Sequence, residues 1–138
     1  MPERIAEYAR ETGQRIPTTP GAISRCILES LALLYRRSIG ELESLTGNPI
    51  NRLHIVGGGT RNELLNQAAA NATGLRIITG PVEATAAGNI LIQAISAGDI
   101  TSLSEARKIV ADSFSQHIFE PQDSSLWEAA YARFVALP

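Results

Sequence analysis

A short apolar run ends in three consecutive glycines at residues 53–62, which read LHIVGGGTRN. The segment Leu53–Val56 has the length and composition of a buried strand, and a helix is expected from Asn62 onward. Glycines let the backbone turn sharply and come close to a flat or anionic ligand. The free amides at the start of the following helix favour negative charge. The stretch therefore predicts a strand, a turn and a helix, with a turn that suits a nucleotide.

Two known glycine-rich nucleotide motifs can be compared with this turn. A P-loop requires Lys and then Ser or Thr after its last glycine, and Thr60-Arg61 follows here instead. A dinucleotide-binding turn, G-x-G-x-x-G, matches at Gly57 and Gly59, but Asn62 stands at the last glycine position. The acidic residue expected at the end of the second strand is also missing. The residues therefore exclude a P-loop. A tight turn without any ligand fits the glycines as well, so this interpretation and the dinucleotide-binding turn both stay open.

Helix and strand signals on both sides of the turn predict an α/β chain with one βαβ unit. Thr19 is a candidate helix cap with Pro20 behind it, and Gly47, Gly74 and Gly98 are stop signals. The two strands should be parallel, with a right-handed crossover. Parallel sheets are usually larger, so we expect part of the sheet to come from other residues. Helices are expected at residues 2–12, 20–46, 62–73, 83–97 and 102–110, with a last helix capped by Asp123, and strands at residues 53–56 and 75–79.

Composition limits the function classes and predicts one domain without an internal linker. The chain has 138 residues and a net charge of −2, which favours neither nucleic acid nor anionic lipid as a partner. Its single cysteine, Cys26, excludes an internal disulfide and suits a cytoplasmic location. We find no signal peptide and no apolar run of about 20 residues, so no membrane segment is expected.

Five stretches resemble the FGGY family of carbohydrate kinases, which share the ATPase fold of actin, Hsp70 and hexokinase. In that family a strand ends in Gly-Gly-Gly, and a helix and a short strand follow. A second helix then begins with a Glu, here Glu83, and carries a glycine where the helix packs near the turn. That glycine is here Gly88, and we expect it to allow close helix packing. The likeness is closer still to the L-rhamnulokinase subfamily and extends from about Met1 to Pro121. It lies in residues 25–35 (RCILESLALLY), 53–59 (LHIVGGG), 62–67 (NELLNQ), 80–85 (GPVEAT) and 88–90 (GNI).

The resemblance implies a fold and a binding site. The fold is an α/β fragment of the ribonuclease H-like ATPase domain, helix-rich with a short parallel βαβ core. Residues 1–138 would be a partial C-terminal, nucleotide-binding domain. The backbone of Gly57, Gly58 and Gly59 would lie against the adenosine and α-phosphate of ATP, with Gly58 as the main contact. Asn62 could approach the purine or act only as a helix cap. Arg61 could reach a phosphate or be solvated, and we expect it to be solvated.

The resemblance also implies that this chain alone is inactive. In the family, the sugar site, the phosphate-binding hairpin and the catalytic Asp lie upstream of the helices seen here. We expect no catalytic residue and no metal ligand in this chain, and the full enzyme would phosphorylate L-rhamnulose with ATP and Mg²⁺. The alternatives are a non-catalytic nucleotide-binding or assembly module and a dinucleotide-binding fragment. Because the β-meander that pairs with strand 53–56 in the family is absent here, an unpaired edge should cause self-association.

Overall fold

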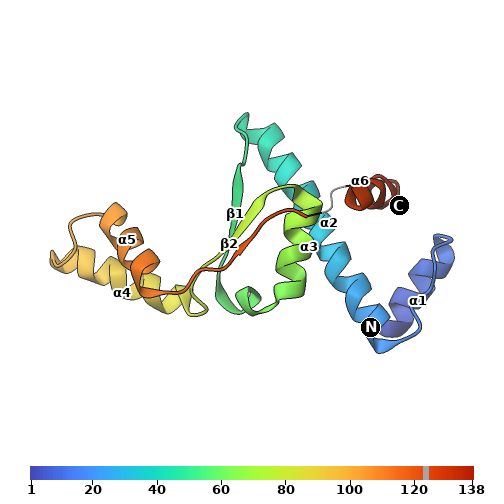
Figure 1. The fold of residues 1–138 in the computed structure, drawn as a ribbon, viewed down its shortest axis with the longest axis horizontal. Coiled ribbons are helices and arrows are strands. Elements are labelled where there is room, and N and C mark those ends of the chain that lie inside the picture. Colours follow the sequence, from blue (N-terminus) through green and yellow to red (C-terminus); the bar gives the residue numbers. More distant parts are fainter. Residues whose placement is uncertain (123–124) are drawn as a thin grey trace.

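A computed structural model describes residues 1–122 and 125–138 as an open, elongated arrangement of helices around a small sheet (Figure 1). Two helices and a C-terminal helix gather at one end, and a helical hairpin extends from the other end. The elements are α1 (Pro2–Glu11), α2 (Pro20–Thr46), β1 (Arg52–Ile55), the 3₁₀ helix η1 (Gly57–Arg61), α3 (Glu63–Thr73), β2 (Arg76–Thr79), α4 (Ala84–Ala97), α5 (Leu103–Ser113), β3 (Ile118–Phe119) and α6 (Ser125–Val135).

The sheet has three strands in the order β1-β2-β3. β1 and β2 are parallel, with Arg52 opposite Arg76 and Ile55 opposite Thr79, so the predicted βαβ unit is confirmed. β3 is antiparallel to β2 and was not predicted. It is attached where the amide of Thr79 donates to the carbonyl of His117 at 2.9 Å. The sheet is therefore mixed, and β1 is an edge strand in the part of the chain that the structure describes.

The helix signals in the sequence place most helix ends correctly. α2 begins and ends where predicted, since the Thr19 hydroxyl accepts from the Ala22 amide at 3.2 Å and Gly47 is left-handed with φ of 67°. α5 begins at the predicted cap, Ser102, whose hydroxyl accepts from the Glu105 amide. It extends to Ser113, beyond the predicted end at residue 110. The predicted cap of α6, Asp123, lies outside the described residues.

Helix α3 joins the two small apolar clusters of the molecule. One of its faces packs against α2 and the partly buried aromatic residues of α6, and the other packs against the sheet. Small side chains allow this, because buried alanines let two layers come close to the helix. The buried members are Ala32, Leu33, Ala68 and Ala72 in the first cluster and Ala69, Ala70 and Ile77 in the second.

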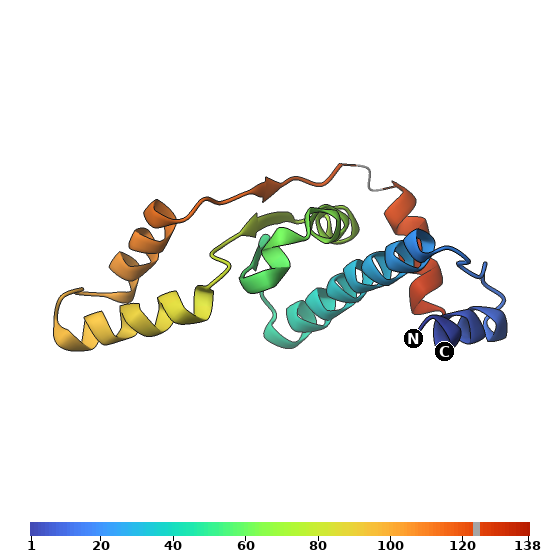
Figure 2. The ribbon, with the colours of Figure 1, turned by 90° about the horizontal axis from the view of Figure 1, so that it is seen from below.

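Polar contacts hold the C-terminal segment along α3 and α2 (Figure 2). The side chain of Gln67 donates to the carbonyl of Glu120 at 2.9 Å, and the amide of Gln122 donates to the side chain of Asn71 at 2.9 Å. Arg36 then donates to the carboxylate of Glu128 on α6 at 2.8 Å, and this hydrogen bond lowers the pKa of Glu128. Residues 118–122 thus lie along α3, and α6 is held against α2.

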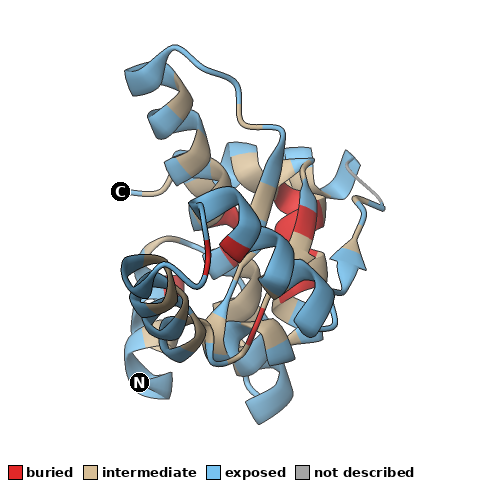
Figure 3. Ribbon diagram, turned by 90° about the vertical axis from the view of Figure 1, so that its left-hand side faces the viewer, coloured by how far each residue is buried: buried red, intermediate tan, exposed pale blue. Residues whose placement is uncertain are grey.

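The α4–α5 hairpin stands away from the two clusters (Figure 1) and is drawn mostly as exposed and partly buried residues (Figure 3). All 14 residues of α4 are exposed or only partly buried, although the helix reads ATAAGNILIQAISA. Ile90 is 67% exposed and Ile92 is 56% exposed. An apolar helix is thus left uncovered by the described residues. Among those residues, no helix combines the length and apolar character that a membrane crossing requires.

Candidate functional site

The ends of β1 and β2 are joined immediately before the glycine turn. The amide of Gly80 donates to the carbonyl of Ile55 at 2.8 Å, and the amide of Gly57 donates to the carbonyl of Pro81 at 2.9 Å. A Cβ atom at Gly80 would lie 2.9 Å from Cγ1 of Val56, which is closer than side chains pack. A larger residue at position 80 would therefore displace the side chain of Val56 or the strand end, and the glycine lets the two strand ends lie in close contact.

The glycine turn itself is a short 3₁₀ helix, η1, and not the direct start of an α-helix. Gly57 has φ of 79°, in the left-handed region that favours glycine. The hydroxyl of Thr60 donates to the carbonyl of Gly57 at 2.8 Å and closes the turn. The α-helix predicted from Asn62 begins one residue later, at Glu63. Asn62 separates it from η1, which ends at Arg61.

Gly58 and Gly59 have neither the left-handed φ of Gly57 nor the close packing of Gly80, so nothing in the described chain favours glycine at these two positions. Gly58 is exposed, and no heavy atom of the described chain lies within 4 Å of the position that its Cβ would take. At Gly59 a Cβ would make an ordinary contact of 3.6 Å with Ile55. Neither residue has a positive φ. The backbone at residue 58 is thus open to a molecule from outside.

Asn62 is the N-cap of α3, which was one of its two predicted roles. Its side-chain oxygen accepts from the amide of Leu65 at 3.1 Å, and its own amide donates to the carbonyl of Gly59 at 3.1 Å. The cap uses the oxygen only, and Nδ2 of Asn62 has no acceptor among the described residues. Asn62 therefore fixes the start of α3 and keeps one polar donor at the turn.

Asn66 is a residue of this site that sequence reasoning missed. It is fully buried, and its Nδ2 donates to the carbonyl of Thr60 at 3.1 Å. Its Oδ1 has no partner among the described residues, and a buried unpaired acceptor costs about 1–3 kcal/mol. The signal in the sequence was the polar side chain of Asn66, which directly follows the apolar pair Leu64 and Leu65 in the predicted helix. Asn66 ties the glycine turn to the centre of α3.

A cavity of about 410 Å³ lies beside the turn, within the size range of small-molecule sites. The C-terminal segment forms one wall with two aromatic rings. Arg61 also lines the cavity, is exposed as expected, and has no ion-pair partner among the described residues. The four predicted nucleotide contacts, Gly57, Gly58, Gly59 and Asn62, lie next to this cavity in sequence but do not line it. The lining residues include Thr60, Arg61, Glu63, Gly80, Pro81, Val82, Phe114, His117 and Phe119.

A second, more apolar groove of about 550 Å³ lies between the strand ends and the α4–α5 hairpin. Gly80 and Pro81 line both this groove and the first cavity. Gly88 was expected to allow close helix packing, and this expectation is wrong for the described chain. It is exposed, with no described heavy atom within 4 Å of its Cβ position, because the hairpin stands away from the sheet.

The side chains of this chain do not form a metal centre in the described part. No group of three or more His, Cys, Asp or Glu residues lies close enough there to hold an ion.

Comparison with known proteins shows which family the segment around the glycine turn comes from. Residues 1–97 match the family model described as the C-terminal domain of the FGGY family of carbohydrate kinases. The chain belongs to the FGGY family. The match contains the glycine turn, α3, β2 and α4, whereas α5, β3 and α6 follow it. The family predicted from the sequence stretches is confirmed.

Curated relatives in the FGGY family carry the name rhamnulokinase. The protein of Bacteroides thetaiotaomicron is 47% identical over 134 residues, which are 97% of this chain and 28% of that protein. The protein of Bacillus subtilis is 45% identical over 89% of this chain and 25% of its own length. That of Yersinia pestis (strain Pestoides F) is 44% identical over 99% of this chain and 28% of its length. The chain thus spans about a quarter of the length of these relatives.

A solved structure supports the FGGY fold. The xylulose kinase of Rhodospirillum rubrum superposes with a TM-score of 0.70 at 21% identity, over 91% of this chain and 25% of that protein. At this identity the likeness shows the fold alone. The predicted fold class, a helix-rich α/β part of this ATPase fold with a parallel βαβ core, is confirmed, with antiparallel β3 as an addition.

The geometry of the turn predicts different effects for two neighbouring glycines. Gly57→Ala should reduce the free energy of unfolding by about 1–2 kcal/mol, because alanine is disfavoured at a left-handed φ. Gly58→Ala should change it by less than about 0.5 kcal/mol, because the new methyl group meets nothing. Urea denaturation followed by circular dichroism measures both. Equal losses in the two variants would contradict the described turn.

Proposed function

We propose that residues 1–138 are part of the C-terminal, nucleotide-binding domain of a rhamnulokinase-like sugar kinase. In the full-length enzyme this domain would serve the ATP-dependent phosphorylation of L-rhamnulose. FGGY family membership and the 44–47% identity to proteins named rhamnulokinase support the proposal. ATP and ADP would be the ligands of this chain, and the sugar would bind only in the full-length enzyme. A cytoplasmic location belongs to the same proposal and rests on the single thiol of Cys26.

The open backbone at Gly58 is the observation that carries nucleotide binding. The left-handed φ explains the glycine at position 57 and close packing explains the one at position 80, but neither explains the one at position 58. A glycine that nothing inside the chain requires suits close approach by a flat or anionic ligand. The ribose and α-phosphate would lie against Gly58 and Gly59, with the Nδ2 donor of Asn62 nearby.

The cavity beside the turn supports the same assignment. Phe114 and Phe119 supply flat apolar surfaces on its C-terminal wall, and such surfaces suit a purine. Arg61 supplies a cation for a phosphate without having to break an ion pair with another described residue. In the full-length enzyme further residues would complete the binding cleft, so the affinity of this chain alone should be weak.

ADP should bind this chain with a Kd in the millimolar range, which corresponds to about −4 kcal/mol. In an NMR titration the amides of Gly58, Gly59 and Asn62 should shift first. Gly58→Val should abolish these shifts, because its side chain would occupy the open face, whereas Gly40→Ala on α2 should leave them unchanged. Shifts confined to another surface, or equal binding of NADH at the turn, would contradict the proposal.

The isolated chain should not phosphorylate L-rhamnulose. Phosphoryl transfer needs a base that orients the sugar hydroxyl, phosphate clamps and Mg²⁺. The described residues contain no group of three or more His, Cys, Asp or Glu side chains that could hold a metal ion. The chain also spans only about a quarter of the length of its relatives. A coupled ADP-release assay should give the rate of the no-enzyme control. Turnover above that rate that disappears in Gly58→Val would contradict the proposal.

We also propose that the chain self-associates. The carbonyl of Ile55 faces β2, so the backbone groups of His54 face the free edge of β1, where another strand can pair. The uncovered side chains of Ile90 and Ile92 on α4 add an apolar surface. Two-fold association is the most common way to cover such surfaces.

Light scattering at tens of micromolar should therefore give at least twice the monomer mass of 14.8 kDa. Ile90→Glu should shift the equilibrium toward the monomer, because a carboxylate is costly in an apolar interface. Ser96→Glu, on the same helix and also exposed, is the matched control and should not. A wild-type monomer that fails to bind a dye for apolar surfaces would show that the chain covers its own edge.

A further inference from the structure

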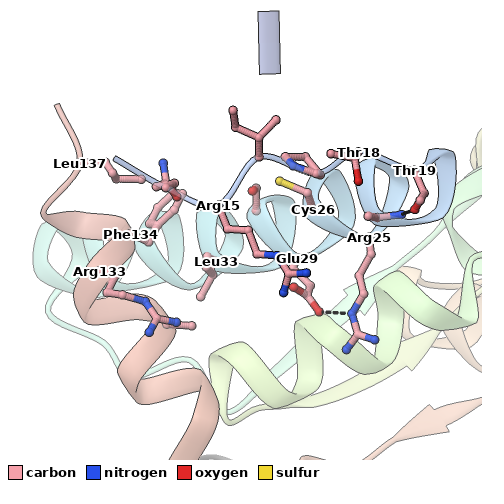
Figure 4. A pocket seen from close by; sticks show the side chains of 16 residues that line it. Arg15, Thr18, Thr19, Arg25, Cys26, Glu29, Leu33, Arg133, Phe134 and Leu137 are labelled. Atoms are coloured by element: carbon pink, nitrogen blue, oxygen red, sulfur yellow. Dashed lines mark hydrogen bonds and ion pairs between the residues drawn. The ribbon is translucent and has the colours of Figure 1, made fainter. Parts of the chain in front are cut away.

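A third cavity lies among the loop before α2, the first turns of α2, and α6 (Figure 4). Its volume is about 620 Å³, within the range of sites that bind small organic molecules. It shares no lining residue with the cavity beside the glycine turn or with the groove at the hairpin. α6 forms one wall and lies beyond the residues that the FGGY family model matches. The cavity is therefore separate from the proposed nucleotide site.

The charge around this cavity is positive, although the chain as a whole is negative. Three arginines and one glutamate line it. Arg25 is neutralised by Glu29 at 2.7 Å, but Arg15 and Arg133 have no ion-pair partner among the described residues. These two come from different segments, the loop and α6, and both line the same opening (Figure 4). Two guanidinium groups that are unpaired within the described part of the chain thus line one cavity.

The rest of the lining is mostly apolar. Leu33 is buried at the base, and Phe134 and Leu137 extend from the C-terminal segment (Figure 4). Ile16 and Cys26 are partly buried on the side of the loop and α2. A purely inorganic anion would leave this surface in contact with water. An organic anion would cover it and also satisfy the arginines.

We propose that this cavity binds a small organic anion, a carboxylate or phosphate ester with an apolar body. The anionic group would bind Arg15 and Arg133, because guanidinium groups match the planar or forked geometry of carboxylate and phosphate oxygens. The apolar body would lie against Leu33 and Phe134. The cavity volume suits a compact molecule. The positive charge of the arginines on its rim favours a ligand with a negative charge. This inference does not depend on the nucleotide proposal.

Benzyl phosphate and benzyl alcohol are matched probes, because they share the ring and differ in the charged group. In an NMR titration of the 138-residue chain, benzyl phosphate should shift the amides of Thr18, Ser30 and Arg133. Benzyl alcohol should bind the cavity at least about tenfold more weakly, as expected for the loss of charge-assisted hydrogen bonds. Hexanoate should compete with benzyl phosphate.

The arginine variants test the assignment directly. Arg15→Gln and Arg133→Gln should each weaken benzyl phosphate binding about fivefold to tenfold, and the double variant more strongly. Arg10→Gln, on α1 and outside the cavity lining, is the matched control with the same loss of charge. Circular dichroism should show unchanged helix content in all variants. Equal affinity for benzyl alcohol, shifts elsewhere on the chain, or an equal loss in Arg10→Gln would overturn the proposal.

Discussion

The strands β1 and β2 end side by side, and there the amide nitrogen of Gly80 donates to the carbonyl oxygen of Ile55 at 2.8 Å. Glycine favours this approach, because a Cβ at position 80 would meet the side chain of Val56 at 2.9 Å and one of the two would have to shift. The adjacent bond from Gly57 to Pro81 then sets the direction in which the chain leaves β1. This contact thus holds the residue at which the glycine turn begins, while the Thr60 hydroxyl and the side chain of Asn66 hold the turn itself.

Helix α3 carries this local geometry into the rest of the molecule. Asn66 holds the carbonyl of Thr60 from inside the core, while the alanines around it pack against α2, α6 and β2. The α4–α5 hairpin has no comparable anchor and leaves its apolar side chains uncovered. In the FGGY family this chain corresponds to about a quarter of a kinase, and an uncovered helix and a free sheet edge suit a part that packs against more protein.

Short sequence signals predicted the helix ends and the parallel strand pair, because neighbouring residues determine these parts of the fold. Thr19, Pro20 and Gly47 gave both ends of α2, and the glycine turn between two β-rich runs gave the parallel pair. β3 has only two residues, too few for a periodic pattern, and its position depends on His117 meeting Thr79 through space. The 3₁₀ turn is held by the Thr60 hydroxyl and the buried Asn66, and no sequence pattern marks such contacts. The aromatic wall of the cavity was missed for the same reason, since Phe114 lies far from the turn in sequence.

Amide hydrogen exchange at Gly57 and Gly80 measures the strand-end contact directly. Both amides donate to carbonyls across the junction, so both should be protected in the wild-type chain. In Gly80→Ala the new methyl group should push the strand ends apart, and both amides should lose their protection while those in the middle of α2 keep theirs. If Gly57 exchanges as fast as an unstructured peptide in the wild type, or keeps its protection in Gly80→Ala, then the junction does not position the glycine turn.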